Sequence, residues 1–246
     1  LNISLNQTED DLLIYFSDDQ LVNSHLPTLP KKRPFGLTDC PGMQFKTDMV
    51  SVLNAKDQVY LERKNIKLLG EHNLLNILAT LNVTQHFNIS KDHISEVLMH
   101  FPGIEHRLEY VRTIHGVDYY NDSKATNVES VKYALKSFNR PVIIILGGRD
   151  KDSDFSILVP ILKAHVKHAL LIGEAASKIE PVIRNIIDYS YTDSMENALN
   201  TATQIAKTGD VVLLAPACAS FDMFDNYEHR GKVFKEIVLS IPEDHK

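Results

Sequence analysis

The sequence has few of the features that direct a protein to nucleic acid or to a membrane. Its formal net charge is −6, and residues 31–33 (KKR) form the only basic run, whereas polyanions select clusters of Lys and Arg. No apolar stretch approaches the roughly 20 residues of a membrane helix, and residues 1–5 lack the basic region of a signal peptide. We therefore expect a cytoplasmic protein that binds neither nucleic acid nor membrane, with residues 31–33 in a solvated loop.

Metal and cofactor signatures are also missing. Cys40 and Cys218 lie far apart in the sequence, so reduced thiols are expected. The eleven histidines show no H-x-x-x-H or H-E-x-x-H spacing, and we predict no metal site in this chain. There is no G-x-x-x-x-G-K-[ST] loop, and no G-x-G-x-x-G follows a strand-like segment. The last absence argues against a nucleotide-dependent dehydrogenase.

The length of 246 residues, with 43% hydrophobic and 24% charged residues, suits one large or two modest domains. Residues 1–68 contain short alternating runs, at 12–16, 49–53 and 58–61, separated by turn formers and by a loop at 26–33. This pattern predicts a mostly antiparallel β region. Two helices should follow, one with a leucine face at 74–81 and one capped by Ser90. Pro102-Gly103 marks the predicted boundary between domains 1–103 and 104–246.

Beyond this boundary strands and helices alternate. A hairpin is predicted across His115-Gly116, and Asn127 should cap the helix that follows it. A closing helix is predicted from about Gly231 to Leu239. Continuous Val, Ile and Leu runs at 142–146, 169–172 and 211–215 are typical of strands covered on both faces. The fold class is therefore α/β, a Rossmann-like, open, mainly parallel sheet with helices on both faces.

Three polar loops follow predicted strands, at residues 121–127, 147–151 and 216–220. Ligands of such sheets bind at the carboxyl ends of the strands, so one crevice could collect all three loops. Lys124, Thr126, Lys151 and Ser220 offer ammonium and hydroxyl donors, and residues 217–221 are expected to open a helix with free backbone amides. The loops predict a site for a small acidic molecule, the alternative being ordinary surface turns.

Four further residues suit a nucleotide. Asp122 could accept from ribose hydroxyls or simply form an Asx-turn. Arg107 follows the predicted boundary, where it could reach a phosphate; a solvated surface arginine is the alternative. Asn73 and Asn76 share one face of a helix start and could read adenine, although Asn73 could instead be a helix cap.

Six motifs, in this order, resemble the C-terminal half of the D-glutamate-adding Mur ligases: GEHNxxN (70–76), EHR (105–107), NDSKATN (121–127), LGGxDK (146–151), LLAPACASFDxF (213–224) and YExRGxxF (227–234). The resemblance implies a monomeric enzyme of peptidoglycan synthesis. It would use ATP and Mg²⁺ to activate the carboxylate of UDP-MurNAc-L-alanine as an acyl phosphate, which the amine of D-glutamate attacks.

The resemblance also assigns roles by position. Asn73 and Asn76 would contact adenine, Arg107 the ATP phosphates, and Asp122 the ribose. D-Glutamate would be held by Thr126, Lys151, Ser220, Phe221 and Tyr227, with Lys124 beside them. Arg107 and Lys124 would be the catalytic residues of this chain.

The sequence also departs from the family pattern at several points. The phosphate loop, the UDP-binding segment and the metal ligands of that family are missing, and Ala215 stands where the family has serine. We therefore expect the end of the central ATP-binding domain followed by a complete third domain, inactive without the rest. The alternatives are a non-catalytic Rossmann-like module for an acidic metabolite or nucleotide, and a sibling Mur or folylpolyglutamate-type ligase.

Overall fold

The computed structural model describes residues 4–37, 40, 42–45, 51–53, 59–63 and 66–243. The chain forms two compact units, Leu1–Pro102 and Gly103–Lys246, so the boundary along the chain falls between Pro102 and Gly103. None of the helices in the described part of the chain is long and apolar enough to cross a membrane.

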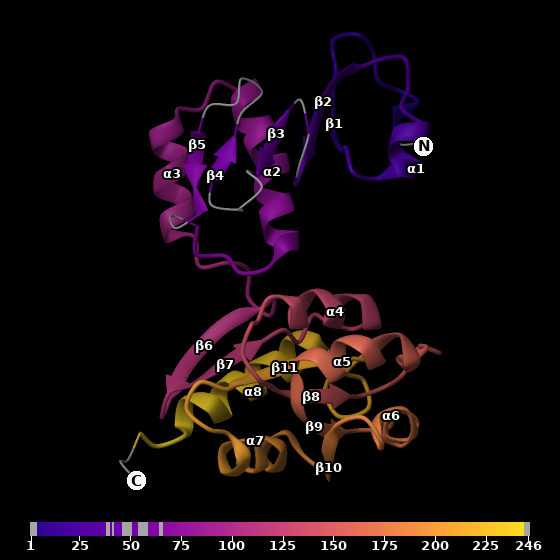
Figure 1. The fold of residues 1–246 in the computed structure, drawn as a ribbon, viewed down its shortest axis with the longest axis vertical. Coiled ribbons are helices and arrows are strands. Elements are labelled where there is room, and N and C mark those ends of the chain that lie inside the picture. Colours follow the sequence, from indigo (N-terminus) through magenta and orange to yellow (C-terminus); the bar gives the residue numbers. More distant parts are fainter. Residues whose placement is uncertain are drawn as a thin grey trace. The chain divides into compact units, whose positions relative to one another are not determined.

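The first unit is a sheet covered by helices (Figure 1). Its elements are β1 (Leu12–Phe16), α1 (Gln20–Ser24), β2 (Lys31–Gly36), β3 (Met43–Phe45), β4 (Ser51–Leu53), β5 (Val59–Glu62), α2 (Glu71–His86) and α3 (Lys91–His100). Leu74, Leu78 and Leu81 of α2 are buried with Met43 and Ile94, so the predicted leucine face is the one that packs in the core. The predicted cap also forms, because the Ser90 side chain accepts from the His93 amide.

The first sheet is mixed, and the prediction of a mostly antiparallel region is wrong. Its strand order is β1-β2-β3-β4-β5, with β1–β2 and β2–β3 parallel and the remaining pairs antiparallel. The reason is α1, a five-residue helix capped by Asp19, which allows the chain to cross over and pair β2 parallel to β1. Residues 31–33 are strand rather than loop, while residues 49, 50 and 58 of the predicted strands lie outside the described residues.

The second unit is the predicted open α/β sheet. Its elements are β6 (Glu109–Ile114), β7 (Val117–Asn121), α4 (Val128–Lys136), β8 (Val142–Gly147), η3 (Phe155–Leu158), α5 (Val159–His165), β9 (Val166–Ile172), α6 (Ala176–Ile183), β10 (Asp188–Thr192), α7 (Met195–Ile205), β11 (Val211–Ala217) and α8 (Tyr227–Ser240). The strand order is β10-β9-β8-β11-β7-β6, and only the edge strand β6 is antiparallel to its neighbour. The fold class is thereby confirmed.

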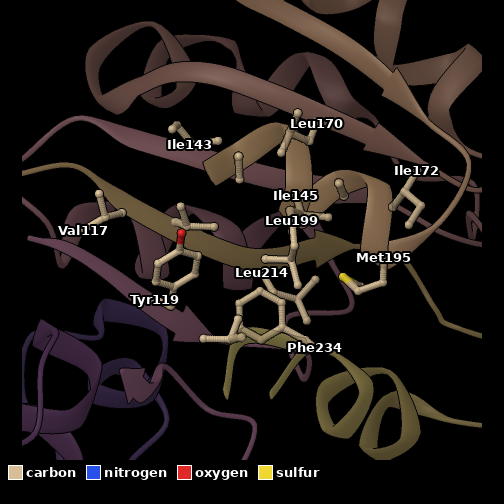
Figure 2. Close-up of a cluster of buried hydrophobic side chains, with 14 of the residues drawn as sticks. Val117, Tyr119, Ile143, Ile145, Leu170, Ile172, Met195, Leu199, Leu214 and Phe234 are labelled. Carbon is tan, nitrogen blue, oxygen red and sulfur yellow. The ribbon is translucent and has the colours of Figure 1, made fainter. Parts of the chain in front are cut away.

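The core of the second unit explains the continuous apolar strands. Alternate residues of β8, such as Ile143 and Ile145, pack with Phe234 of α8 and Leu199 of α7 on one face of the sheet (Figure 2). The residues between them are also fully buried, and α4, η3, α5 and α6 contact one another and the sheet. Both faces of the central strands are therefore covered, as the sequence predicts.

Two elements of the second unit differ from the prediction. Strand β10 was not predicted, because Asp188–Thr192 (DYSYT) alternates polar residues with tyrosine and lacks the aliphatic run of a central strand. It lies at the edge of the sheet, where such a composition is tolerated. Helix α8 begins at Tyr227 rather than near Gly231, because the Asn226 side chain accepts from the His229 amide and caps it there.

Candidate functional site

The three polar loops follow three neighbouring parallel strands. The chain leaves β8 toward β9 and β10, and then returns to place β11 between β8 and β7. Strand order therefore reverses around β11, which is the position where open α/β sheets bind ligands. The loops after β7, β8 and β11 begin side by side at the carboxyl edge of the sheet.

Backbone hydrogen bonds connect the three loops to one another. The Ala217 amide donates to the Ala125 carbonyl at 2.9 Å. Arg149 and Ala219 exchange two bonds, at 2.9 and 3.0 Å. A Cβ added at Gly148 would lie 2.3 Å from the Ala219 carbonyl oxygen, so this close approach requires glycine. The loops thus form one continuous surface at the edge of the sheet.

The same contacts overturn one prediction. Residues 217–221 do not open a helix: Ala217 ends β11, and a turn begins at Ser220, whose carbonyl accepts from Met223 and Phe224. The amides of Ala217 and Ala219 already donate to backbone carbonyls. An anion at this site would therefore be bound by side chains rather than by these two backbone amides.

Arg230 lies beneath the loops and is their main side-chain connection. It is 2% exposed, and its Nε donates to Ser123 Oγ at 3.0 Å. Its Nη2 donates to the carbonyls of Ser123 (2.9 Å) and Cys218 (3.1 Å), and its Nη1 donates to the Ala219 carbonyl (3.3 Å). Burial lowers the pKa of Arg230 to about 10. One guanidinium thus joins the loops after β7 and β11 to the first turn of α8.

Arg230 belongs to the YExRGxxF motif at residues 227–234, but the motif alone predicts no role for it. A signal was nevertheless present, because residues 230, 234 and 238 are spaced to share one face of a helix. Phe234 and Val238 are fully buried core residues. An arginine in register with two core positions indicates a buried guanidinium.

The loop after β7 carries two of the predicted donors. Lys124 Nζ lies 3.6 Å from the centroid of the Tyr227 ring, a cation–π contact. Ser123 Oγ donates to the Tyr227 carbonyl at 2.8 Å, which fixes the start of α8 against this loop. Thr126 is partly buried just before Asn127, whose side chain caps α4. Lys124, Thr126 and Tyr227 are therefore brought to the same region of the second unit.

The other predicted D-glutamate residues follow β8 and β11. Lys151 is exposed in the loop after β8, and Ser220 is buried after β11. Phe221, the next residue, is 62% exposed although it is large and apolar. The loops that carry them are connected through the Arg149–Ala219 pair. Lys151 and Phe221 are therefore exposed along this edge, whereas Ser220 is buried there.

Asp122 is the first residue after β7, at the start of the loop that carries Lys124 and Thr126. Its Oδ1 accepts from the Leu108 amide at 3.1 Å, and the Lys124 amide donates to His106, so the side chain does not form the Asx-turn considered as an alternative. Burial raises the pKa of Asp122 to about 7, although the Leu108 amide and the charge of Arg107 both favour ionisation. Arg107 itself is exposed.

Asn73 and Asn76 lie on α2, in the first unit. Gly70 is the N-cap of this helix, and Asn73 Nδ2 donates to the Leu69 carbonyl at 2.8 Å. Asn73 is therefore not the simple cap considered as its alternative. Asn76 is exposed one turn further along.

One side-chain cluster in the second unit has the spacing of a metal site. Glu105, His106 and Glu109 each offer a ligand atom within 4.8 Å of the others, where the sequence predicted none. Lys235 Nζ, however, lies 2.8 Å from Glu105 and 2.6 Å from Glu109, so both carboxylates already have a cationic partner. Elsewhere a cavity of about 430 Å³ is lined by Tyr191, Thr192, Asp193, Asn197 and Thr201, none of them a predicted site residue.

Comparison with known proteins gives a consistent result. Residues 106–218 match the family described as Mur ligase, glutamate ligase domain. The chain is 39% identical over 249 residues to a UDP-N-acetylmuramoylalanine–D-glutamate ligase from Salinibacter ruber, covering 98% of the chain and 54% of that protein. A protein of the same name from Koribacter versatilis is 47% identical over 179 residues, covering 73% of the chain and 39% of that protein. The chain spans about half the length of the curated relatives it matches.

Solved structures share the fold at low sequence identity. A UDP-N-acetylmuramate-alanine ligase from Thermotoga maritima superimposes with a TM-score of 0.66 at 17% identity, over 94% of this chain and 52% of that one. A MurF ligase from the same organism, in complex with ADP, gives a TM-score of 0.61 at 17% identity, over 94% and 54%.

Proposed function

Because this chain belongs to the Mur ligase family, we propose that it is the C-terminal half of an ATP-dependent ligase that forms an amide bond in peptidoglycan synthesis. The reaction would join D-glutamate to UDP-MurNAc-L-alanine, in the cytoplasm, through an acyl-phosphate intermediate. Residues 1–103 would be the end of the central ATPase domain, and residues 104–246 the C-terminal amino-acid-binding domain. The coverage of 54% of the Salinibacter ruber protein supports a parent protein about twice as long as this chain.

The observation that carries the proposal is the connection of the three loops around β11. They bring an ammonium from Lys124, another from Lys151, and hydroxyls from Thr126 and Ser220 to one edge of the sheet. A dicarboxylic amino acid needs such donors for its two carboxylates. The exposed ring of Phe221 would cover the aliphatic part of the substrate, and the ring of Tyr227 holds the Lys124 ammonium.

The nucleotide residues fit ATP by their chemistry. Asp122 Oδ1 is occupied by the Leu108 amide, so Oδ2 is the oxygen that would accept a ribose hydroxyl. Arg107 is an exposed cation nearby in sequence, suited to the phosphates, and Asn73 and Asn76 would contact adenine. When bound, ATP supplies the phosphoryl group that makes the substrate carboxylate a better electrophile, and Mg²⁺, held mostly outside this chain, offsets charge.

The test uses the full-length enzyme that contains this chain. ADP release should require both UDP-MurNAc-L-alanine and D-glutamate, and L-glutamate or L-lysine should not replace D-glutamate. The 246-residue chain alone should release no ADP. Acceptance of L-lysine would reassign the protein to a sibling ligase, and turnover by the isolated chain would refute the division proposed for the parent protein.

A second test isolates the amino-acid site. Lys151→Ala should raise the KM for D-glutamate at least tenfold more than the KM for ATP, because about 1.4 kcal/mol of lost charge-assisted binding is a factor of ten. The matched control is Lys163→Ala, which removes an exposed lysine from α5 and should change neither constant. Equal effects of Lys151→Ala on both KM values would contradict the assignment.

A further inference from the structure

Asp150 precedes Lys151 and is anchored on both carboxylate oxygens. Its side chain is 6% exposed, although it belongs to a loop. Its Oδ1 accepts from the Ser153 amide at 2.9 Å, and its Oδ2 accepts from Lys178 Nζ at 2.8 Å. Lys178 belongs to α6, which follows the neighbouring strand β9. The loop after β8 is therefore held both by its own Ser153 amide and by Lys178 of α6.

The backbone around Lys151 is constrained at the same points. Gly148 has φ of 128° and Asp152 has φ of 59°, so left-handed positions stand on either side of Lys151. The Ala175 amide donates to the Gly148 carbonyl at 2.8 Å, a second connection between this loop and the start of α6. A residue between two fixed neighbours has little freedom to move its Cα.

The carboxylate of Asp150 points toward its anchors, and its charge is stable. Burial alone would raise its pKa, but the hydrogen bond and charge of Lys178 and the Ser153 amide together lower it to about 2. The ion pair therefore persists at any neutral pH. A carboxylate in direct contact with a dicarboxylic substrate would repel it, whereas this one is occupied by Lys178.

We propose that Asp150 and Lys178 are positioning residues that hold the loop after β8 so that the Lys151 ammonium is presented to the amino-acid substrate. This inference rests on the proposed function, since the substrate is the dicarboxylic amino acid of that site. Neither residue contacts the substrate; both act through Lys151. The arrangement assigns α6, which carries no predicted site residue, a role in substrate affinity.

The experiment compares Lys178→Met, Lys178→Arg and Asp150→Asn in the full-length enzyme. Lys178→Met should raise the KM for D-glutamate about two- to fivefold, the factor that one partly exposed ion pair contributes, with kcat and the KM for ATP unchanged. Lys178→Arg keeps the charge and should restore the wild-type KM. Asp150→Asn should behave like Lys178→Met, since it retains the Oδ1 acceptor but loses the ion pair.

The matched control is Arg184→Met, which removes an exposed arginine paired with Glu180 at the other end of α6. It should leave the KM for D-glutamate unchanged. Amide hydrogen exchange on the full-length enzyme provides a readout independent of turnover: Lys178→Met should speed exchange at Ser153, and Arg184→Met should not.

The outcomes separate the two proposals. Faster exchange at Ser153 without any change in the KM for D-glutamate would overturn the positioning role while leaving the proposed function intact. Unchanged exchange in Lys178→Met would also overturn it. A wild-type enzyme that shows no dependence on D-glutamate would refute the proposed function, and the substrate-directed role would fail with it, whatever the exchange rates show.

Discussion

Replacing Arg230 with Met tests whether a buried guanidinium holds the candidate site together. Methionine keeps most of the aliphatic length and removes every donor. In the structure these donors reach Ser123 Oγ and the carbonyls of Ser123, Cys218 and Ala219. The perturbation therefore removes bonds from two loops at once, without opening a large cavity.

The expected magnitude follows from which acceptors lose their donor. The Ala219 carbonyl also accepts from the Arg149 amide, and Ser123 Oγ still donates to Tyr227, so both keep a partner. The Ser123 and Cys218 carbonyls lose the Arg230 donor, and each buried carbonyl without a partner costs about 1–3 kcal/mol. Relief from burying an arginine charge offsets part of this. We expect Arg230→Met to lower the free energy of unfolding of the second unit by about 2–4 kcal/mol.

The assay is urea unfolding followed by circular dichroism, with Arg184→Met as the control for removing an exposed arginine. Arg230→Lys should be nearly as destabilising as Arg230→Met, since a single ammonium cannot reach the acceptors of both loops at once. A loss below about 1 kcal/mol for Arg230→Met, or a loss equal to that of Arg184→Met, would refute the reasoning, because surface pairs contribute no more than this.

Two further predictions concern residues around the same loops. Gly231→Ala should lower the free energy of unfolding by about 1–3 kcal/mol, since the added Cβ would lie 2.3 Å from His106 Nδ1. The control is Lys232→Ala, on the exposed face of α8. Equal melting temperatures for the two variants would contradict the predicted clash with His106. The pKa of Asp122 is about 7 in the folded protein and about 4 in the unfolded chain. Ionisation of Asp122 therefore disfavours folding, and the free energy of unfolding should fall by up to about 4 kcal/mol as the pH rises from 4 to 7. Asp122→Asn should remove that part of the pH dependence, and identical pH profiles for the two proteins would show that Asp122 titrates normally.

The second unit was predictable because its sequence signals are local and strong. Runs such as residues 142–146 are too apolar and too short for anything but a covered strand, and Asn127 has the composition of a helix cap. The first unit was harder. Whether β1 and β2 run parallel depends on α1, a helix of five residues that has no apolar periodicity to reveal it.

The site was predictable in its loops but not in its connections. The carboxyl-edge rule places residues 121–127, 147–151 and 216–220 together, because it follows from strand order alone. The hydrogen bonds of Arg230 to Ser123 join residues 107 positions apart in sequence, and the ion pair of Asp150 with Lys178 joins residues 28 positions apart. Such pairs depend on how helices α6 and α8 pack, which no local pattern specifies. For the same reason the sequence suggested a helix start at 217–221, where β11 in fact continues to Ala217.

The choice of arginine at position 230 connects the stability of the loops with their chemistry. Loop carbonyls outside helices and strands need donors, and the guanidinium supplies several in a fixed plane, which an apolar residue of the same size could not do. The Arg230 guanidinium donates to carbonyls and a hydroxyl rather than to a carboxylate, while the charge of Asp222 acts on it from nearby. Asp122, the partly buried acid of the adjacent loop, is itself half protonated near neutral pH. The group that holds the loops together is therefore also a buried positive charge next to the candidate site, and this charge contributes favourably to binding an anion.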